Sequence, residues 1–184
     1  DINPSRPATL NPAKAVAAIR RYGVTNAFGS PVIWRILGRY CREKEITLDS
    51  MRRILVAGAA APVSLYREYR DLTPAGVMAS PYGATECLPV SAISDEDVLG
   101  GTEHETASGR GICVGQPFEG VEVRIIEPRL HEVLVPGENL RFLPQGSIGE
   151  ILVSGPTMTR SYFRLAEATA LSKVEYEGRL WHRM

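Results

Sequence analysis

The stretch that decides the fold is Ser80-Pro81-Tyr82-Gly83-Ala84-Thr85-Glu86, which follows the short apolar run Val77-Met78-Ala79. A run of this kind, ended by a loop of small residues, predicts a buried strand of an α/β sheet. A second run, Ile54-Leu55-Val56-Ala57, ends in the same way, in the loop Gly58-Ala59-Ala60-Ala61-Pro62. Open α/β sheets bind ligands at the carboxyl ends of their strands. The two loops are therefore the first candidates for a binding site.

The residue types in the first loop suit a nucleotide. Gly83 lets backbone approach a ligand closely, and Tyr82 offers an aromatic face for a purine. Thr85 can donate a hydrogen bond to a phosphate oxygen, and Glu86 can hold a hard divalent cation. The residues alone leave an ordinary strand-to-loop turn as the alternative.

Composition narrows the choice of partners. The chain has 184 residues, 44% of them hydrophobic, and its 21 basic and 21 acidic residues give a formal net charge of zero. This size allows one substantial core, or one domain and part of another. The charge balance gives no reason to propose nucleic acid or an anionic membrane as partner, and no apolar run approaches the roughly 18 residues of a membrane span.

The cysteines and histidines predict no metal site. Cys41, Cys87 and Cys113 are widely spaced and odd in number, which favours reduced thiols in a cytoplasmic protein. Cys87 directly follows Glu86, so a reactive thiol is the alternative to a small buried hydrophobe. The three histidines have no ligand spacing, and no role is assigned to them.

Strands alternate with helices up to about residue 100. Asn11-Pro12 predicts a helix start and Gly23 its end, a second helix begins after Ser30, and a third covers about 63–70. This alternation predicts a parallel, layered α/β sheet. From 101 onward the pattern changes to strands, at 121–125 and 149–153, with a helix from about residue 165. We therefore expect an α/β subdomain over 1–100 and a mostly antiparallel β subdomain over 101–184.

Four motifs in order resemble the adenylate-forming superfamily of acyl-CoA synthetases, luciferases and peptide-synthetase adenylation domains. Residues 82–86 resemble its Tyr-Gly-x-Thr-Glu motif, and 58–62 its adenine loop. Residues 114–117 resemble its Val-Gly-x-Pro segment, and 149–163 its Gly-Glu-Leu…Gly-Tyr-Trp motif. Together they span most of the chain.

The resemblance implies a role for each matched residue. The adenine would lie between the backbone of Ala60, Ala61 and Pro62 and the ring of Tyr82, with Gly83 and Ala84 beside it. Thr85 would contact the α-phosphate, and Glu86 would ligate Mg²⁺. ATP and a carboxylic acid would then give an acyl-adenylate and pyrophosphate, with Thr85 and Glu86 as the catalytic residues.

The chain also departs from the family pattern. Ser161 stands where the family has glycine, and Pro81 precedes the tyrosine where many members carry glycine. Residues 181–184 resemble the lead-in to the ribose-binding Thr-Gly-Asp motif, with Met184 at the threonine position. The upstream phosphate loop and the carboxyl-terminal lid with its lysine have no counterpart here. We expect a middle fragment that is inactive by itself and that self-associates through uncovered sheet edges.

The acid and the acceptor are less constrained. Family analogy places an acyl pocket beside the adenine loop, formed by Phe28, Ser30, Trp34, Gly58 and Ala59. For Trp34, an ordinary position in the hydrophobic core is the alternative. Residues 24–31 and 80–82 resemble the synthetases of bacterial long-chain olefin biosynthesis, which implies a long-chain β-hydroxy acid closed to a β-lactone without coenzyme A. A fatty acyl-CoA synthetase, for which coenzyme A is the acceptor, and a non-catalytic nucleotide-binding or interaction module remain the alternatives, and other pathway enzymes are candidate partners.

Overall fold

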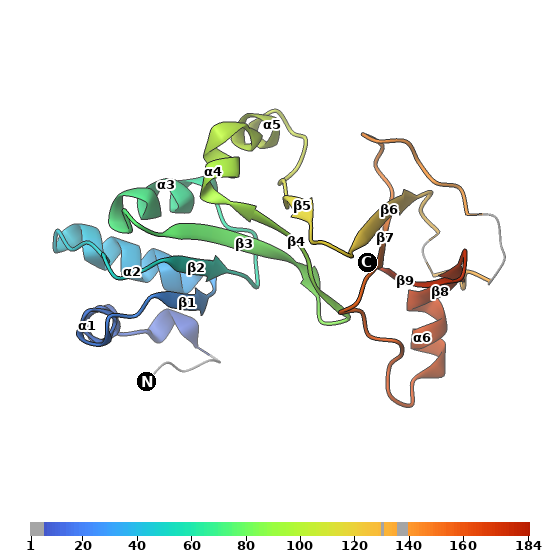
Figure 1. The fold of residues 1–184 in the computed structure, drawn as a ribbon, viewed down its shortest axis with the longest axis horizontal. Coiled ribbons are helices and arrows are strands. Elements are labelled where there is room, and N and C mark those ends of the chain that lie inside the picture. Colours follow the sequence, from blue (N-terminus) through green and yellow to red (C-terminus); the bar gives the residue numbers. More distant parts are fainter. Residues whose placement is uncertain (1–5, 130, 136–139) are drawn as a thin grey trace. The chain divides into compact units, whose positions relative to one another are not determined.

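The structure is a computed structural model that describes residues 6–129, 131–135 and 140–184 (Figure 1). The chain forms two compact units, which are described separately here. Unit 1 comprises 1–81 with 92–116, and unit 2 comprises 82–91 with 117–184. The functional division into 1–100 and 101–184 stays a prediction.

Unit 1 is an α/β layer built on parallel strands. Strands β1, β2 and β3 pair in parallel, with Phe28 opposite Leu55 and Leu55 opposite Ala79. The five-stranded sheet has the order β1-β2-β3-β4-β5. In chain order the elements up to residue 117, of which β3, β4 and β5 each contain residues of both units, are η1 (Pro7–Thr9), α1 (Pro12–Tyr22), β1 (Asn26–Gly29), α2 (Pro31–Glu43), β2 (Arg53–Val56), α3 (Val63–Leu72), β3 (Val77–Ala84), β4 (Cys87–Ser94), α4 (Asp95–Asp97), η2 (Val98–Thr102), α5 (Glu103–Ala107) and β5 (Gln116–Pro117).

The helices begin where the sequence signals them. The Asn11 side chain accepts a hydrogen bond from the Lys14 backbone N–H at 3.1 Å, which satisfies one of the free donors at the start of α1. Pro12 occupies the first turn, and α1 ends at Gly23. Helix α2 begins with Pro31 after Ser30. The predicted starts of both helices are confirmed.

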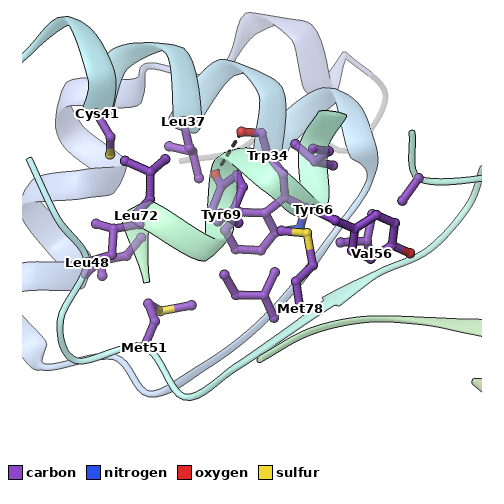
Figure 2. Close-up of a cluster of buried hydrophobic side chains, with 14 of the residues drawn as sticks. Trp34, Leu37, Cys41, Leu48, Met51, Val56, Tyr66, Tyr69, Leu72 and Met78 are labelled. Atoms are coloured by element: carbon purple, nitrogen blue, oxygen red, sulfur yellow. Dashed lines mark hydrogen bonds between the residues drawn. The ribbon is translucent and has the colours of Figure 1, made fainter. Parts of the chain in front are cut away.

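The core of unit 1 lies between α2, α3 and one face of the strands (Figure 2). Trp34 and Tyr69 meet edge to face with ring centroids 5.6 Å apart, and the Tyr69 hydroxyl donates to the Trp34 carbonyl at 2.8 Å. Met78 and Val56 close this core from the strands. The strands alternate, so Leu55 and its neighbours Phe28 and Val77 point to the opposite face, where they are exposed.

Unit 2 is antiparallel, as the second half of the sequence predicts. Its four-stranded sheet has the order β6-β7-β9-β8, and each neighbouring pair runs antiparallel. Trp181 and Leu152 lie fully buried in its core. The elements are β6 (Glu122–Ile126), β7 (Glu150–Ser154), α6 (Ala166–Ser172), β8 (Lys173–Tyr176) and β9 (Arg179–Arg183).

A buried ion pair joins two strands of unit 2. The Arg183 Nε donates to Glu150 Oε1 at 2.5 Å, and the two side chains are 6% and 7% exposed. The remaining Arg183 donors reach the carbonyls of Arg129 at 2.6 Å, Leu171 at 2.9 Å and Glu132. The second Glu150 oxygen accepts from the Arg129 N–H at 3.0 Å. Both buried charges are therefore hydrogen-bonded as well as paired, which burial requires.

The Val-Gly-x-Pro segment owes its glycine to a close backbone approach. Gly115 has φ +81°, and a Cβ there would lie 1.7 Å from the Ala92 carbonyl oxygen. We expect Gly115→Ala to lower the free energy of unfolding by roughly 2–3 kcal/mol. The added Cβ would displace the backbone at Ala92, and alanine would also be strained at this positive φ. Urea unfolding of the whole protein measures the loss.

Gly111→Ala is the matched control for that substitution. Gly111 has nearly the same φ, +84°, but a Cβ there would meet nothing within 4 Å. It therefore carries only the backbone strain, about 1 kcal/mol. Equal losses for the two variants would contradict the packing explanation.

Candidate functional site

The loop between β3 and β4 is tightly turned and shows why a glycine stands in it. A Cβ on Gly83 would lie 2.6 Å from the Cys87 carbonyl oxygen, so no other residue fits without movement. Cys87 is fully buried, with its Sγ 3.9 Å from the Thr157 hydroxyl. The structure favours the buried-hydrophobe interpretation of Cys87 over a reactive thiol. Tyr82 is half-buried and packs against the apolar cluster formed by Cys87, Val90 and Val153, whereas Thr85 is exposed.

Glu86 is held at two points by one segment of unit 2. Its carbonyl accepts a hydrogen bond from the Thr159 N–H at 2.7 Å, and the Tyr162 hydroxyl donates to its Oε1. The hydrogen bond from Tyr162 lowers the pKa of the Glu86 carboxyl below its usual range. The side chain is therefore ionised at neutral pH, which a role as cation ligand requires.

Two titratable side chains that the sequence did not single out, Lys173 and His182, lie near this carboxylate. Lys173 is 7% exposed, and its ammonium donates to the Thr159 hydroxyl at 3.3 Å. His182 is 4% exposed, with Nδ1 3.0 Å from the Ser172 carbonyl, so Nδ1 carries the proton in this hydrogen bond. Lys173 and His182 lie opposite each other on β8 and β9. Together with Glu86 and Tyr162 they form what we call the Glu86 cluster.

Burial changes the pKa of both Lys173 and His182. It lowers the pKa of Lys173, against the opposing attraction of Glu86. Burial also lowers the pKa of His182, and the nearby Lys173 charge lowers it further, whereas the Ser172 carbonyl and Glu86 raise it. His182 is therefore neutral at pH 7, and the positive charge facing Glu86 comes from Lys173.

The depressed His182 pKa predicts a stability loss in acid. The unfolded chain takes up a proton below about pH 6.5, while the folded protein does so only at lower pH. The contribution of His182 to the free energy of unfolding is therefore fully present above this pH. It is lost as the pH drops, by at most about 1.4 kcal/mol per pH unit. We expect His182→Gln to flatten this part of the profile in urea unfolding between about pH 5 and 8. A slope unchanged in His182→Gln would contradict the prediction.

The donor set around Glu86 suits Mg²⁺ delivered with a nucleotide. Magnesium is bound through one or two carboxylates plus substrate phosphates and water, rather than in a cage of protein ligands. Among residues 6–129, 131–135 and 140–184, no group of three or more His, Cys, Asp or Glu side chains could hold a metal ion. Glu86 supplies one ionised carboxylate and the preceding residue, Thr85, is exposed, which fits the binding of Mg²⁺ together with substrate phosphates.

The adenine loop lies in unit 1, at the end of β2. Gly58, Ala59 and Ala60 are exposed, whereas Ala61 is part of the core. The Ala57 N–H donates to the Gly29 carbonyl at 3.2 Å, so the carboxyl ends of β1 and β2 lie side by side. This brings the backbone before Ser30 next to the start of the adenine loop. The predicted contacts of this loop and of Pro62 with an adenine stay predictions.

The other predicted acyl-pocket residues are dispersed within unit 1. Trp34 is 2% exposed and lies in the core, while Phe28 is 70% exposed on the opposite face of the sheet. The Ser30 hydroxyl and the Trp34 Nε1 are buried without a hydrogen-bond partner among the described residues. The acyl pocket stays a prediction.

Comparison with known proteins gives the family. Residues 2–163 match the model of the AMP-binding enzyme family. The chain belongs to this family. The AMP-binding enzymes it resembles include the olefin beta-lactone synthetases of Stenotrophomonas maltophilia (strain K279a) and of Xanthomonas campestris pv. campestris, each 40% identical over the whole of this chain and 33% of the relative.

More distant relatives and solved structures agree with this family. The 3-methylmercaptopropionyl-CoA ligase of Ruegeria pomeroyi is 29% identical over 85% of this chain and 28% of its own. VinN is 26% identical with a TM-score of 0.70, over 91% of this chain and 38% of its own. The amide bond synthetase McbA of Marinactinospora thermotolerans is 25% identical with a TM-score of 0.69, over 95% and 34%. The chain thus spans about a third of the length of the curated relatives it matches. In the part that the structure describes, no helix has the length and apolar character of a membrane span.

Proposed function

We propose that the whole protein activates a carboxylic acid with ATP, forming an acyl-adenylate and releasing pyrophosphate. The observation that carries this proposal is the ionised Glu86 carboxylate, which accepts a hydrogen bond from the Tyr162 hydroxyl and directly follows the exposed Thr85 in the chain. A carboxylate that can take a hard cation, next to a hydroxyl that can reach a phosphate oxygen, suits attack at an α-phosphorus.

The proposed step assigns a task to each residue of the loop. An oxygen of the acid bonds to the α-phosphorus while the bond from that phosphorus to the bridging oxygen of pyrophosphate breaks. Mg²⁺, when bound, neutralises charge that builds on the phosphate oxygens. Glu86 would hold this ion, and Thr85 would donate to an α-phosphate oxygen. Tyr82, Gly83 and Ala84 would line the nucleotide with the backbone of Ala60, Ala61 and Pro62.

We propose further that the acid is a long-chain β-hydroxy acid that closes to a β-lactone. The hydroxyl oxygen would attack the acyl carbon, AMP would leave, and the hydroxyl proton would pass to solvent. The support is the 40% identity to two olefin beta-lactone synthetases over the whole chain. Phe28, Ser30, Trp34, Gly58 and Ala59 would contribute to the acyl pocket.

Transfer to coenzyme A is the second candidate for the capture step. Several relatives at 28–30% identity are acyl-CoA ligases or synthases, among them a long-chain-fatty-acid–CoA ligase of Thermus thermophilus. A thiol would then replace the internal hydroxyl as the nucleophile, with the same adenylate as its target.

Pyrophosphate release from ATP and Mg²⁺ by the whole protein tests the proposal. The panel of acids includes long-chain 2-alkyl-3-hydroxy acids, each with and without coenzyme A. We expect acid-dependent release that is indifferent to coenzyme A, and a β-lactone in the product extract. Dependence on coenzyme A would favour the thiol route. If none of the acids in the panel gave pyrophosphate release, a non-catalytic nucleotide-binding module would be the better account.

A further inference from the structure

Tyr162 lies 76 residues after Glu86 in the sequence, yet its hydroxyl donates directly to the Glu86 carboxylate. Nothing in the resemblance assigns this side chain a task. Since a carboxylate at a loop tip has several rotamers, a single hydrogen bond from a fixed donor selects one of them. The hydrogen bond from Tyr162 goes to Oε1 of the carboxylate and not to Oε2.

The main chain of Tyr162 is itself held by hydrogen bonds to residues at the start of α6. Its backbone N–H donates to the Thr169 hydroxyl at 3.0 Å, and this hydroxyl donates to the Leu165 carbonyl at 2.9 Å in the first turn of α6. Three residues earlier, the Thr159 N–H holds the Glu86 carbonyl at 2.7 Å, and Lys173 holds the Thr159 hydroxyl at 3.3 Å. The segment 159–162 thus hydrogen-bonds both the main chain of Glu86, through Thr159, and its side chain, through Tyr162.

We propose that Tyr162 is a positioning residue that orients the Glu86 carboxylate for the metal of the nucleotide substrate. Groups that hydrogen-bond a metal ligand orient it before the metal arrives, and their loss typically costs 10–100-fold in metal affinity or activity. The inference rests on the proposed function, because it takes Glu86 as the Mg²⁺ ligand. It adds a residue that acts through Glu86 without touching the substrate.

Tyr162→Phe in the whole protein tests this role, since phenylalanine keeps the ring and removes only the hydroxyl, which also has a hydrogen bond with Ser172. We expect the Mg²⁺ concentration for half-maximal pyrophosphate release to rise about 10-fold, with a smaller change in the rate at saturating Mg²⁺. Binding of Mn²⁺, followed by electron paramagnetic resonance with a non-hydrolysable ATP analogue, should weaken by a similar factor. Tyr176→Phe is the matched control, because Tyr176 is in the same unit and its ring packs edge to face on Phe142.

A double-mutant cycle separates positioning from a general loss of structure. In a Glu86→Gln background, Tyr162→Phe should cause no further loss of Mn²⁺ affinity, because the ligand it orients has already lost its charge. Equal losses in both backgrounds would overturn the inference, and so would unchanged metal binding in Tyr162→Phe when Glu86→Gln lowers it. If Glu86→Gln itself left metal binding and release unchanged, the assignment of Glu86 would fail first, and the proposed function with it.

Discussion

Glu86→Gln in the whole protein is expected to slow acid-dependent pyrophosphate release by roughly 100-fold or more at saturating acid. Glutamine keeps the shape of the side chain and an oxygen that accepts the Tyr162 hydrogen bond, but it removes the charge that attracts a divalent cation. The charge that develops on the transferring phosphate would then lose its best counter-ion. Steady-state release over a range of Mg²⁺ concentrations measures the effect.

Glu167→Gln provides the control for that experiment. Glu167 is an exposed residue of α6 in the same unit as Glu86. Its substitution removes one negative charge, as Glu86→Gln does. We expect release within about twofold of the wild-type rate, since surface substitutions of this kind are usually near neutral. If Glu86→Gln behaved like Glu167→Gln, the carboxylate of Glu86 would have no part in the reaction.

Glu150→Ala is expected to produce the largest loss of stability, about 3–5 kcal/mol in the free energy of unfolding. The substitution leaves the Arg183 guanidinium buried without its counter-charge, although its contacts to backbone carbonyls remain. It also removes the carboxylate oxygen that accepts the hydrogen bond from the Arg129 N–H. Urea unfolding of the whole protein measures the loss.

An exposed ion pair of the same unit shows what burial contributes. Glu127 lies 3.5 Å from Arg141, and both side chains are more than half exposed. Glu127→Ala should therefore cost less than about 1 kcal/mol. A similar loss for Glu127→Ala and Glu150→Ala would contradict the view that the cost arises from an uncompensated buried charge.

The fold class could be predicted from the sequence because its signals are local. Asn11, Pro12 and Gly23 mark the two ends of α1, and the structure begins and ends the helix between them. The runs before Gly58 and Ser80 form parallel neighbours, and the alternating pattern after residue 120 forms an antiparallel sheet. Capping residues and hydrophobic periodicity act over a few positions, so they can be read without knowledge of the tertiary structure.

The surroundings of Glu86 could not be predicted in the same way. Lys173 and His182 face each other because the two-residue turn Glu177-Gly178 sets the register of the β8–β9 hairpin, but nothing in the sequence of that hairpin places the pair near Glu86. Tyr162 reaches Glu86 across 76 residues. The loop with Thr85 and Glu86 was therefore identified from the sequence, whereas the groups that hold it were not.

For Trp34 the sequence left two interpretations open. The analogy placed it beside an acyl chain, yet its position after Ile33 at helical spacing equally allowed a core residue. The structure packs its ring against Tyr69 with almost no exposure. A helix position alone does not distinguish a residue that lines a pocket from one that fills the core, because both are apolar and both face the sheet.

Transfer of oxygen-18 from the acid to AMP tests the central claim most directly. The whole protein is incubated with ATP, Mg²⁺ and a long-chain β-hydroxy acid labelled in its carboxylate, and AMP and pyrophosphate are analysed by mass spectrometry. If the acid attacks the α-phosphorus, capture of the acyl group leaves one labelled oxygen in AMP and none in pyrophosphate. Unlabelled AMP, or label in inorganic phosphate together with ADP, would show that no acyl-adenylate forms and would contradict the account.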